Sequence, residues 1–215
     1  PALSRGGVVR SEAIEVRLRR CLPDVDAVAL KPLAEALLSA WSEPQRAYHT
    51  PQHLQECLAG FDTVCEALQW PAAVELALIF HDAVYEPERH DNEQRSADWA
   101  VSALTTLGAS NALCERVAAL VMATQSHQPP AGDSSPEDTA LLLDIDLSIL
   151  GSAPARFAEY EQQIRREYHF VPEAQYQAAR QRVMQGFAQR PGLFHSEHFT
   201  QRLAAAAARN LRGFA

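Results

Sequence analysis

The stretch from Pro71 to Tyr85 reads Pro-Ala-Ala-Val-Glu-Leu-Ala-Leu-Ile-Phe-His-Asp-Ala-Val-Tyr. Apolar residues fill nearly every position of Val74–Phe80, on all sides of a helix rather than on one face, which predicts a buried central helix ending near Tyr85. The polar pair His81-Asp82 follows this apolar run directly. A buried carboxylate without a partner is strongly destabilising, so the pair predicts a cation near the end of the helix.

The rest of the chain also predicts helices. Apolar residues recur three and four positions apart, alternation with period two is nearly absent, and strong helix formers dominate. We expect an all-α fold of roughly eight to ten helices. Counted with their capping residues, they are expected over Ser11–Cys21, Asp26–Ser42, Thr50–Gln69, Pro71–Tyr85, Asn92–Leu107, Ser110–Ser126, Pro136–Leu150, Pro154–Tyr168, Pro172–Gln189 and Ser196–Arg212.

Local signals set the expected helix boundaries. Side chains suited to N-caps are Ser11, Thr50, Asn92 and Ser110, and the glycines placed to stop helices are Gly108 and Gly151. The segment His127–Asp138 is rich in proline, glycine and serine, so we expect a mobile loop there.

Composition limits the possible functions. The net charge of −8 speaks against binding of duplex nucleic acid, which needs clustered lysine and arginine, but not against a small phosphorylated ligand. The chain has neither a signal-peptide pattern nor an apolar run of the ~20 residues that a membrane span needs, so we expect a cytoplasmic protein without membrane contact. No pair of the four cysteines has C-x-x-C spacing, and we interpret them as reduced core residues.

Two further clusters place metal-ligand side chains in predicted helices. One is Tyr48-His49-Thr50-Pro51-Gln52-His53, and the other is Asp144-Ile145-Asp146 within a run of leucine and isoleucine. A single histidine on an apolar face is more often a hydrogen-bonded core residue, and a single aspartate often caps a turn. The ordered set His53, His81, Asp82 and Asp146, spread over three helices, favours a divalent metal site. Two roles stay open for Asp144: it orients a ligand histidine, or it is the metal ligand in place of Asp146.

This order of residues resembles the signature of the HD superfamily of metal-dependent phosphohydrolases. The segment Tyr48–His53 is also similar to the Y-H-N-x-x-H motif of cyclic-nucleotide phosphodiesterases, a branch of that superfamily, with Thr50 in place of the usual asparagine. That likeness implies that His49 donates a proton to the leaving group and that His53 binds the metal.

The likeness to a bacterial subgroup of predicted HD-type phosphohydrolases covers the chain from about Trp41 to its C-terminus. It rests on the segments Phe80–Tyr85, Asp91–Ala97, Ala123–His127 and Asp144–Gly151. The resemblance implies a single HD-type helical domain over 1–215, with a core over about 41–151 and a C-terminal helical lobe over 152–215 that packs on it.

The expected function is hydrolysis of a small phosphorylated compound, with a nucleotide as the preferred substrate, by metal-activated water. Glu93 is a second candidate for acid–base catalysis beside His49. Candidate substrate-binding residues are Arg46, Tyr48, His127 and Arg180. Imidazole ligands favour a transition ion, Mn²⁺ first, with Ni²⁺, Co²⁺, Fe²⁺ or Zn²⁺ as alternatives and Mg²⁺ as a functional substitute.

Two alternatives stay open at this point. A di-iron HD-type oxygenase would need further ligands, which His127 with His90 or His49 can supply. A non-catalytic sensor that binds a nucleotide is the other. Hydrolysis of (p)ppGpp ranks low, because the stretch Ala83–Pro87 lacks the Glu-Asp pair expected for it. The sequence leaves a monomer and a homodimer equally open.

Overall fold

The computed structural model describes residues 9–214, and within this range it is all-helical and without strands. The predicted all-α class is therefore confirmed. The α-helices are α1 (Ser11–Cys21), α2 (Ala27–Trp41), α3 (Pro51–Asp62), α4 (Pro71–Phe80), α5 (Asn92–Thr106), α6 (Asn111–Ala123), α7 (Pro136–Asp146), α8 (Pro154–Glu167), α9 (Glu173–Ala188) and α10 (Glu197–Leu211).

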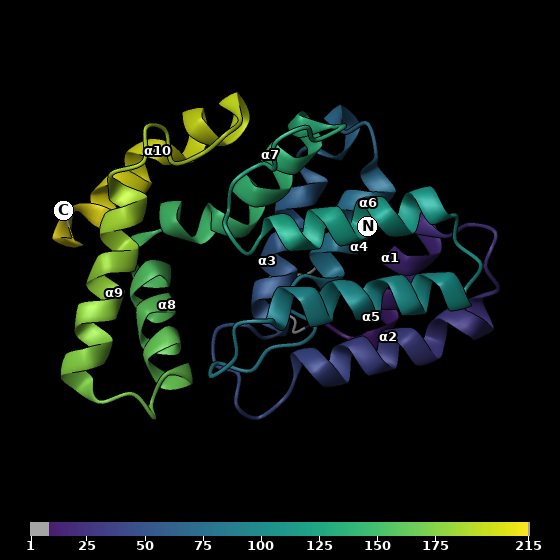
Figure 1. Ribbon diagram of the computed structural model, residues 1–215, viewed down its shortest axis with the longest axis horizontal. Helices are drawn as coiled ribbons and strands as arrows, with labels where there is room; N and C mark the ends of the chain where they lie inside the picture. The colour runs from purple at the N-terminus through teal and green to yellow at the C-terminus, as the bar shows by residue number, and fades with distance from the viewer. Residues whose placement is uncertain (1–8, 215) are drawn as a thin grey trace.

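The central helix is α4, as the apolar run predicts. Every residue of Ala73–Phe80 is buried, and α4 packs against α1, α3, α5, α6 and α7 (Figure 1). The helix ends at Phe80, however, and not near Tyr85. The amide of His81 still bonds to the carbonyl of Ala77, whereas the amide of Ala83 bonds to the carbonyl of Phe80 and closes a tight turn.

One carboxylate lies within this apolar helix. Glu75 is only 1% exposed, and its oxygens accept hydrogen bonds from Arg17 and Arg20 of α1. The two guanidinium groups compensate the buried charge, so Glu75 links α4 to α1.

Three further predicted helices are longer than the observed ones because 3-10 turns or loops replace their last segments. The helix predicted to reach Gln69 ends at Asp62 and is followed by η1 (Cys65–Ala67). The helix predicted to reach Leu150 ends at Asp146 and continues as η2 (Leu147–Gly151). The helix predicted to reach Ser126 ends at Ala123.

The capping predictions are partly confirmed. Thr50 accepts a hydrogen bond from the amide of Gln52, and Ser110 accepts one from the amide of Leu113. Ser11 and Asn92 are wrong as N-caps, because each is already the first helical residue. Gly108 follows α5 with φ +78°, a left-handed conformation that a helix stop requires.

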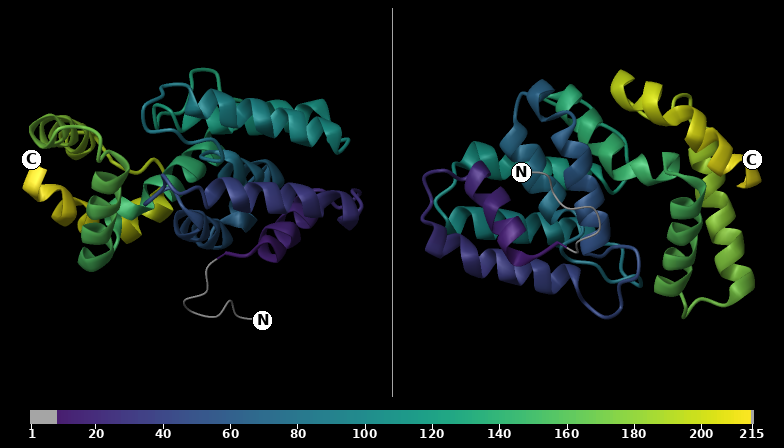
Figure 2. Two further views of the ribbon diagram at one scale, coloured as in Figure 1. Left: turned by 90° about the horizontal axis from the view of Figure 1, so that it is seen from below. Right: turned by 180° about the vertical axis from the view of Figure 1, so that it is seen from behind.

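Helices α8, α9 and α10 lie together at one end of the molecule, beside the body formed by α1–α7 (Figures 1 and 2). The segment η2 connects the two groups and packs against α10. A Cβ placed on Gly151 would lie 2.6 Å from Cβ of Leu203. This close approach explains why a glycine stands at the end of η2.

Within residues 9–214, none of the helices combines the length and the apolar character that crossing a bilayer requires.

Candidate functional site

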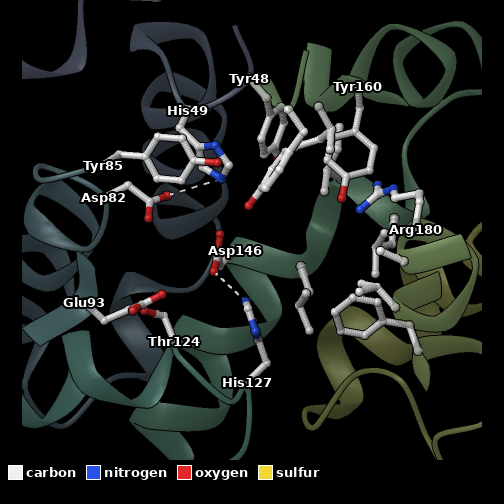
Figure 3. Close-up of a pocket in the computed structure, with 18 of the residues that line it drawn as sticks. Tyr48, His49, Asp82, Tyr85, Glu93, Thr124, His127, Asp146, Tyr160 and Arg180 are labelled. Carbon is white, nitrogen blue, oxygen red and sulfur yellow. Dashed lines mark hydrogen bonds and ion pairs between the residues drawn. The ribbon is translucent and has the colours of Figure 1, made fainter. Parts of the chain in front are cut away.

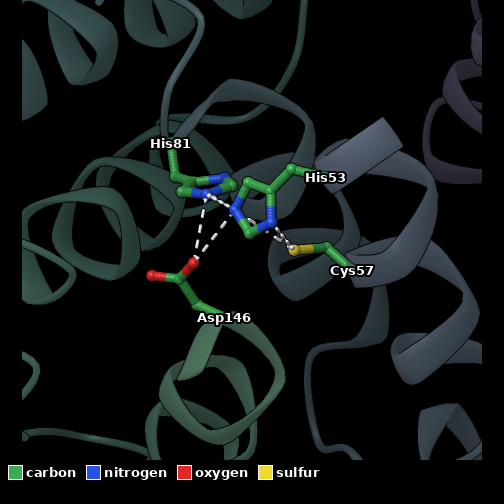
Figure 4. Close-up of side chains that lie close together, drawn as sticks. All are labelled: His53, Cys57, His81 and Asp146. Carbon is green, nitrogen blue, oxygen red and sulfur yellow. Dashed lines mark hydrogen bonds and ion pairs between the residues drawn. The ribbon is translucent and has the colours of Figure 1, made fainter. Parts of the chain in front are cut away.

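Side chains from three separate helices meet in one buried cluster (Figure 4). Nε2 of His53 in α3 lies 3.3 Å from Nε2 of His81, which follows α4. Oδ1 of Asp146, at the end of α7, lies 3.2 Å from Nε2 of His53 and 3.5 Å from Nε2 of His81. The donor atoms all point at one another, and this group could hold a metal ion.

The carboxylate of Asp82 reaches the same point. Its Oδ2 lies 3.0 Å from Nε2 of His81 and 3.8 Å from Nε2 of His53. Two side chains of α5 fix the turn that presents it. Ser96 accepts a hydrogen bond from the amide of Val84, and Asn92 bonds to both the amide and the carbonyl of Glu86. The Asp91–Ala97 segment therefore shapes the chain that follows the central helix.

The donor chemistry of the cluster fits a divalent cation. Nδ1 of His81 lies 2.9 Å from the carbonyl oxygen of Leu78, so in the neutral ring the proton is on Nδ1 and the lone pair on Nε2 faces two carboxylates. Lone pairs that converge in this way repel unless a positive charge lies between them. Burial opposes protonation of His81, but Asp82 and Asp146 outweigh it and raise the His81 pKa well above its usual value. The site is thus built to attract positive charge.

Asp144 and Asp146 have different partners, which answers the question left open by the sequence. The carboxylate of Asp144 accepts hydrogen bonds of 2.7 Å from the amides of His195 and Ser196 and one of 2.6 Å from the hydroxyl of Ser196. These residues directly precede α10, so Asp144 anchors its N-terminus. Of these two aspartates, only Asp146 faces the histidine cluster.

Cys57 belongs to the cluster and was not singled out by the sequence analysis. It is 1% exposed, and its Sγ lies 3.7 Å from Nε2 and 3.7 Å from Nδ1 of His53. The spacing His53-x-x-x-Cys57 was the available signal, because residues four apart share one helix face. All four cysteines are free thiols; Cys21 and Cys114 are also buried, whereas Cys65 is partly exposed rather than a core residue.

His127 contacts the second oxygen of Asp146. Its Nε2 lies 3.0 Å from Oδ2 of Asp146, while Oδ1 faces His53 and His81. The backbone of His127 has φ +49°, an uncommon value for a residue other than glycine. Its carbonyl accepts hydrogen bonds from Arg190 and His195, which hold this conformation. His127 thus lies at the start of the predicted loop and orients Asp146.

His49 is held by a carboxylate from the C-terminal helices. Nδ1 of His49 lies 2.8 Å from Oε2 of Glu167, and Nε2 lies 3.9 Å from Oδ2 of Asp82. The other Glu167 oxygen accepts hydrogen bonds from the amides of Ala47, Tyr48 and His49. Glu167 is 1% exposed; burial opposes its ionisation, but the charge of His49 and these hydrogen bonds lower its pKa to about 2. Burial likewise opposes the protonation of His49, but Glu167 and Asp82 raise its pKa.

The cluster opens onto a cavity of about 400 Å³ between the two groups of helices (Figure 3). On the metal side it is lined by His49, Asp82, Glu93, His127 and Asp146. The opposite side is mostly aromatic and aliphatic, with Tyr160, Ile164, Tyr168, Tyr176 and Phe187. Of the predicted substrate-binding residues, Tyr48, His127 and Arg180 line this cavity. A volume of this size suits a small organic ligand.

Arg46 is not part of the cavity wall. Its guanidinium makes five hydrogen bonds, to the carboxylate of Glu43 and to the carbonyls of His49, Asp82 and Ala83. A guanidinium has five N–H donors, so none is left for a phosphate. The predicted phosphate contact is therefore wrong, because Arg46 fixes the backbones that carry His49 and Asp82.

Arg180 lines the cavity but also has a partner. Its guanidinium is paired with Glu161 and lies over the ring of Tyr160, 4.9 Å from the centroid. His90, named for a di-iron site, is exposed in the loop before α5 and does not line the cavity.

Comparison with known proteins adds no assignment. No protein-family model matches this chain, no curated protein is significantly similar to it, and no solved structure matches it.

Proposed function

We propose that this chain is an HD-type metal-dependent phosphohydrolase that acts on a small phosphorylated compound, with a nucleotide as the preferred substrate. The observation that carries the proposal is the convergence of His53, His81, Asp82 and Asp146 at the floor of a ligand-sized cavity. These four side chains would hold a divalent ion. When bound, the ion supplies an acidified water and polarises a phosphoryl oxygen, which is the chemistry that phosphoester hydrolysis needs.

His49 is the proposed proton donor for the leaving oxygen. Glu167 accepts at Nδ1, which leaves Nε2 of His49 on the cavity side near Asp82. A carboxylate partner of this kind fixes the orientation of the ring and favours its protonated form. Glu93, which lies beside Thr124 on the same side of the cavity, remains the second candidate for proton transfer (Figure 3).

The far half of the cavity suits the organic part of the substrate. Aromatic rings line it, and such rings stack on bases or other flat groups. The hydroxyl of Tyr48 is buried and has no hydrogen-bond partner among the described residues. A substrate oxygen at that position would satisfy it, and Arg180 would face the negative charge of the substrate.

A second ion is a further proposal at the same site. Asp146 directs Oδ1 to His53 and His81 and Oδ2 to His127, so Oδ2 and His127 together would hold the second ion. Of the further ligands that a di-iron oxygenase needs, His90 lies outside the cavity and Nδ1 of His49 is held by Glu167, which leaves His127, so the hydrolase ranks above the oxygenase.

A phosphate-release screen tests the proposed activity. Wild type is incubated with nucleoside mono- and triphosphates, and with cyclic nucleotides coupled to an alkaline phosphatase that frees the phosphate of the monoester product, in the presence of Mn²⁺, Co²⁺, Ni²⁺, Zn²⁺ or Mg²⁺, beside His81→Ala and Asp82→Ala. We expect release by wild type and its loss in both variants. His198→Ala is the matched control, because this histidine is partly exposed and lies outside the cavity. Equal release by wild type and both site variants would reject the hydrolase.

A further inference from the structure

Tyrosine side chains gather around the cavity. All five tyrosines of the chain line it, although they come from segments as far apart as Tyr48 and Tyr176. Figure 3 shows Tyr48, Tyr85 and Tyr160 among the side chains around this space. A tyrosine ring has a flat apolar face and one polar atom at its tip, so it can contact both the plane and the edge of an aromatic ligand. A wall of this composition favours a flat ring system that carries polar atoms, which is the chemistry of a nucleobase.

Positive charge is scarce around the same cavity. Lys31, the single lysine of the chain, is exposed on α2 and does not line the cavity. Within residues 9–214, Arg180 is the one arginine that lines it, and Nε and Nη2 of its guanidinium both donate to the carboxylate of Glu161. Because Glu161 balances the charge of Arg180, the pair contributes no net positive charge to the cavity.

Negative charge is already present on the metal side of the cavity, where Asp82, Glu93 and Asp146 line it. A divalent ion held as proposed above would balance Asp82 and Asp146, which leaves Glu93 facing the substrate. A phosphomonoester carries a charge of about −1.5 to −2 at neutral pH, and each further phosphoryl group adds at least one negative charge. The second divalent ion proposed above would compensate one phosphoryl group and not three.

Proteins that bind di- and triphosphates answer this charge with lysine, clustered arginines or a glycine-rich loop. Among the described residues, the cavity wall contains none of these three features. The charge around the cavity therefore favours a substrate with one phosphoryl group.

We infer that the substrate carries a single phosphoryl group on a nucleoside, and that nucleoside di- and triphosphates are poor substrates. The inference rests on the proposed hydrolase and names the substrate class of its site. The phosphoryl group lies at the floor of the cavity beside Asp82 and Asp146, and the base lies among the tyrosines of the far wall. Water attacks phosphorus, the bond from phosphorus to the ester oxygen breaks, and the leaving oxygen takes a proton from His49. The products are the nucleoside and inorganic phosphate, or the linear monophosphate when the substrate is a cyclic diester.

Turnover of matched substrates tests the inference on the wild-type protein. The metal-loaded protein is compared on the mono-, di- and triphosphates and the cyclic monophosphates of adenosine and uridine, and on ribose phosphate, which has the same ester without a base. Products are separated by chromatography. We expect kcat/KM for the better single-phosphoryl nucleotide, linear or cyclic, to exceed that for the triphosphate and for ribose phosphate by about tenfold or more.

Equal or faster turnover of a triphosphate would overturn the inference and leave the hydrolase intact. Equal turnover of ribose phosphate would do the same, because the base would then contribute nothing. A wild type that hydrolyses none of these compounds with any of the metal ions would instead reject the proposed function.

Glu161→Gln tests the charge argument separately. Glutamine keeps the size of the side chain but removes the charge that balances Arg180, so this variant should raise kcat/KM for the triphosphate relative to the monophosphate by about threefold or more. Glu159→Gln is the matched control, since Glu159 lies on the same helix, pairs with Arg156 and does not line the cavity. It should leave the ratio unchanged. If the ratio is also unchanged in Glu161→Gln, charge does not select the substrate and the inference fails.

Discussion

Replacing Glu167 by glutamine should destabilise the protein in a pH-dependent way. The carboxylate of Glu167 in α8 accepts hydrogen bonds from three consecutive amides and contacts His49 and the hydroxyl of Tyr85. It therefore joins the C-terminal helices to the segment that carries His49. Glutamine has nearly the same shape but no charge, and one of its two terminal atoms donates rather than accepts, so the amides lose part of their acceptor.

The size of the effect follows from the pKa. Folding lowers the pKa of Glu167 from its ordinary 4.5 to about 2, and one pKa unit corresponds to ~1.4 kcal/mol, which gives about 3 kcal/mol. Because the folded pKa is the lower one, this stability is present above pH 4.5 and is lost as the pH falls toward 2. The raised pKa of His49 reflects the same ion pair and is not added to this value.

Urea unfolding followed by circular dichroism at pH 7 and near pH 3 measures this difference. We expect Glu167→Gln to lower the free energy of unfolding by about 3 kcal/mol at pH 7, and by clearly less near pH 3. Glu159→Gln on the same helix is the control, since Glu159 is half exposed and its ion pair with Arg156 should contribute less than about 1 kcal/mol. The reasoning would be refuted by a loss that is the same at both pH values, or by one no larger than that of the control.

Two further pairs of substitutions test how the site is supported. Gly151→Ala should lower the free energy of unfolding by about 1–3 kcal/mol, because the new methyl group would meet Leu203 of α10. Gly186→Ala is the control, since Gly186 in α9 has open space around it; in the same thermal melts this variant should be neutral or stabilising. Asp144→Asn should destabilise the protein by about 1 kcal/mol through the N-terminus of α10 and leave metal binding intact, whereas Asp146→Asn should weaken metal binding strongly. Equal metal affinities of these two aspartate variants in a calorimetric titration would contradict the assignment.

The central part of the site could be predicted because it breaks a strong pattern. His81 and Asp82 directly follow a run that is apolar on all sides, and Asp146 ends another apolar stretch, so each residue stands out in the sequence alone. The structure brings these side chains together with His53. The end of α4 was not predictable to within a turn, because helical propensity continues through Ala83 while a tertiary turn held by α5 takes over.

The parts that escaped prediction depend on contacts between distant segments. Glu167 lies next to two arginines in a polar helix and looks exposed in the sequence, yet docking against residues 47–49 buries it. Arg46 looks like a phosphate ligand in the sequence, but in the structure its five N–H groups donate to backbone carbonyls and to Glu43. The choice between Asp144 and Asp146 is made by the N-terminus of α10, far along the chain. No local pattern carries this information.

A crystal structure grown with a divalent transition ion, with anomalous diffraction at the absorption edge of the metal, tests the central claim most directly. We predict an anomalous peak bound by His53, His81, Asp82 and Asp146 at the floor of the cavity. Metal-loaded crystals without a peak at this position, or with these four side chains turned away from one another, would contradict the proposed site and with it the proposed chemistry.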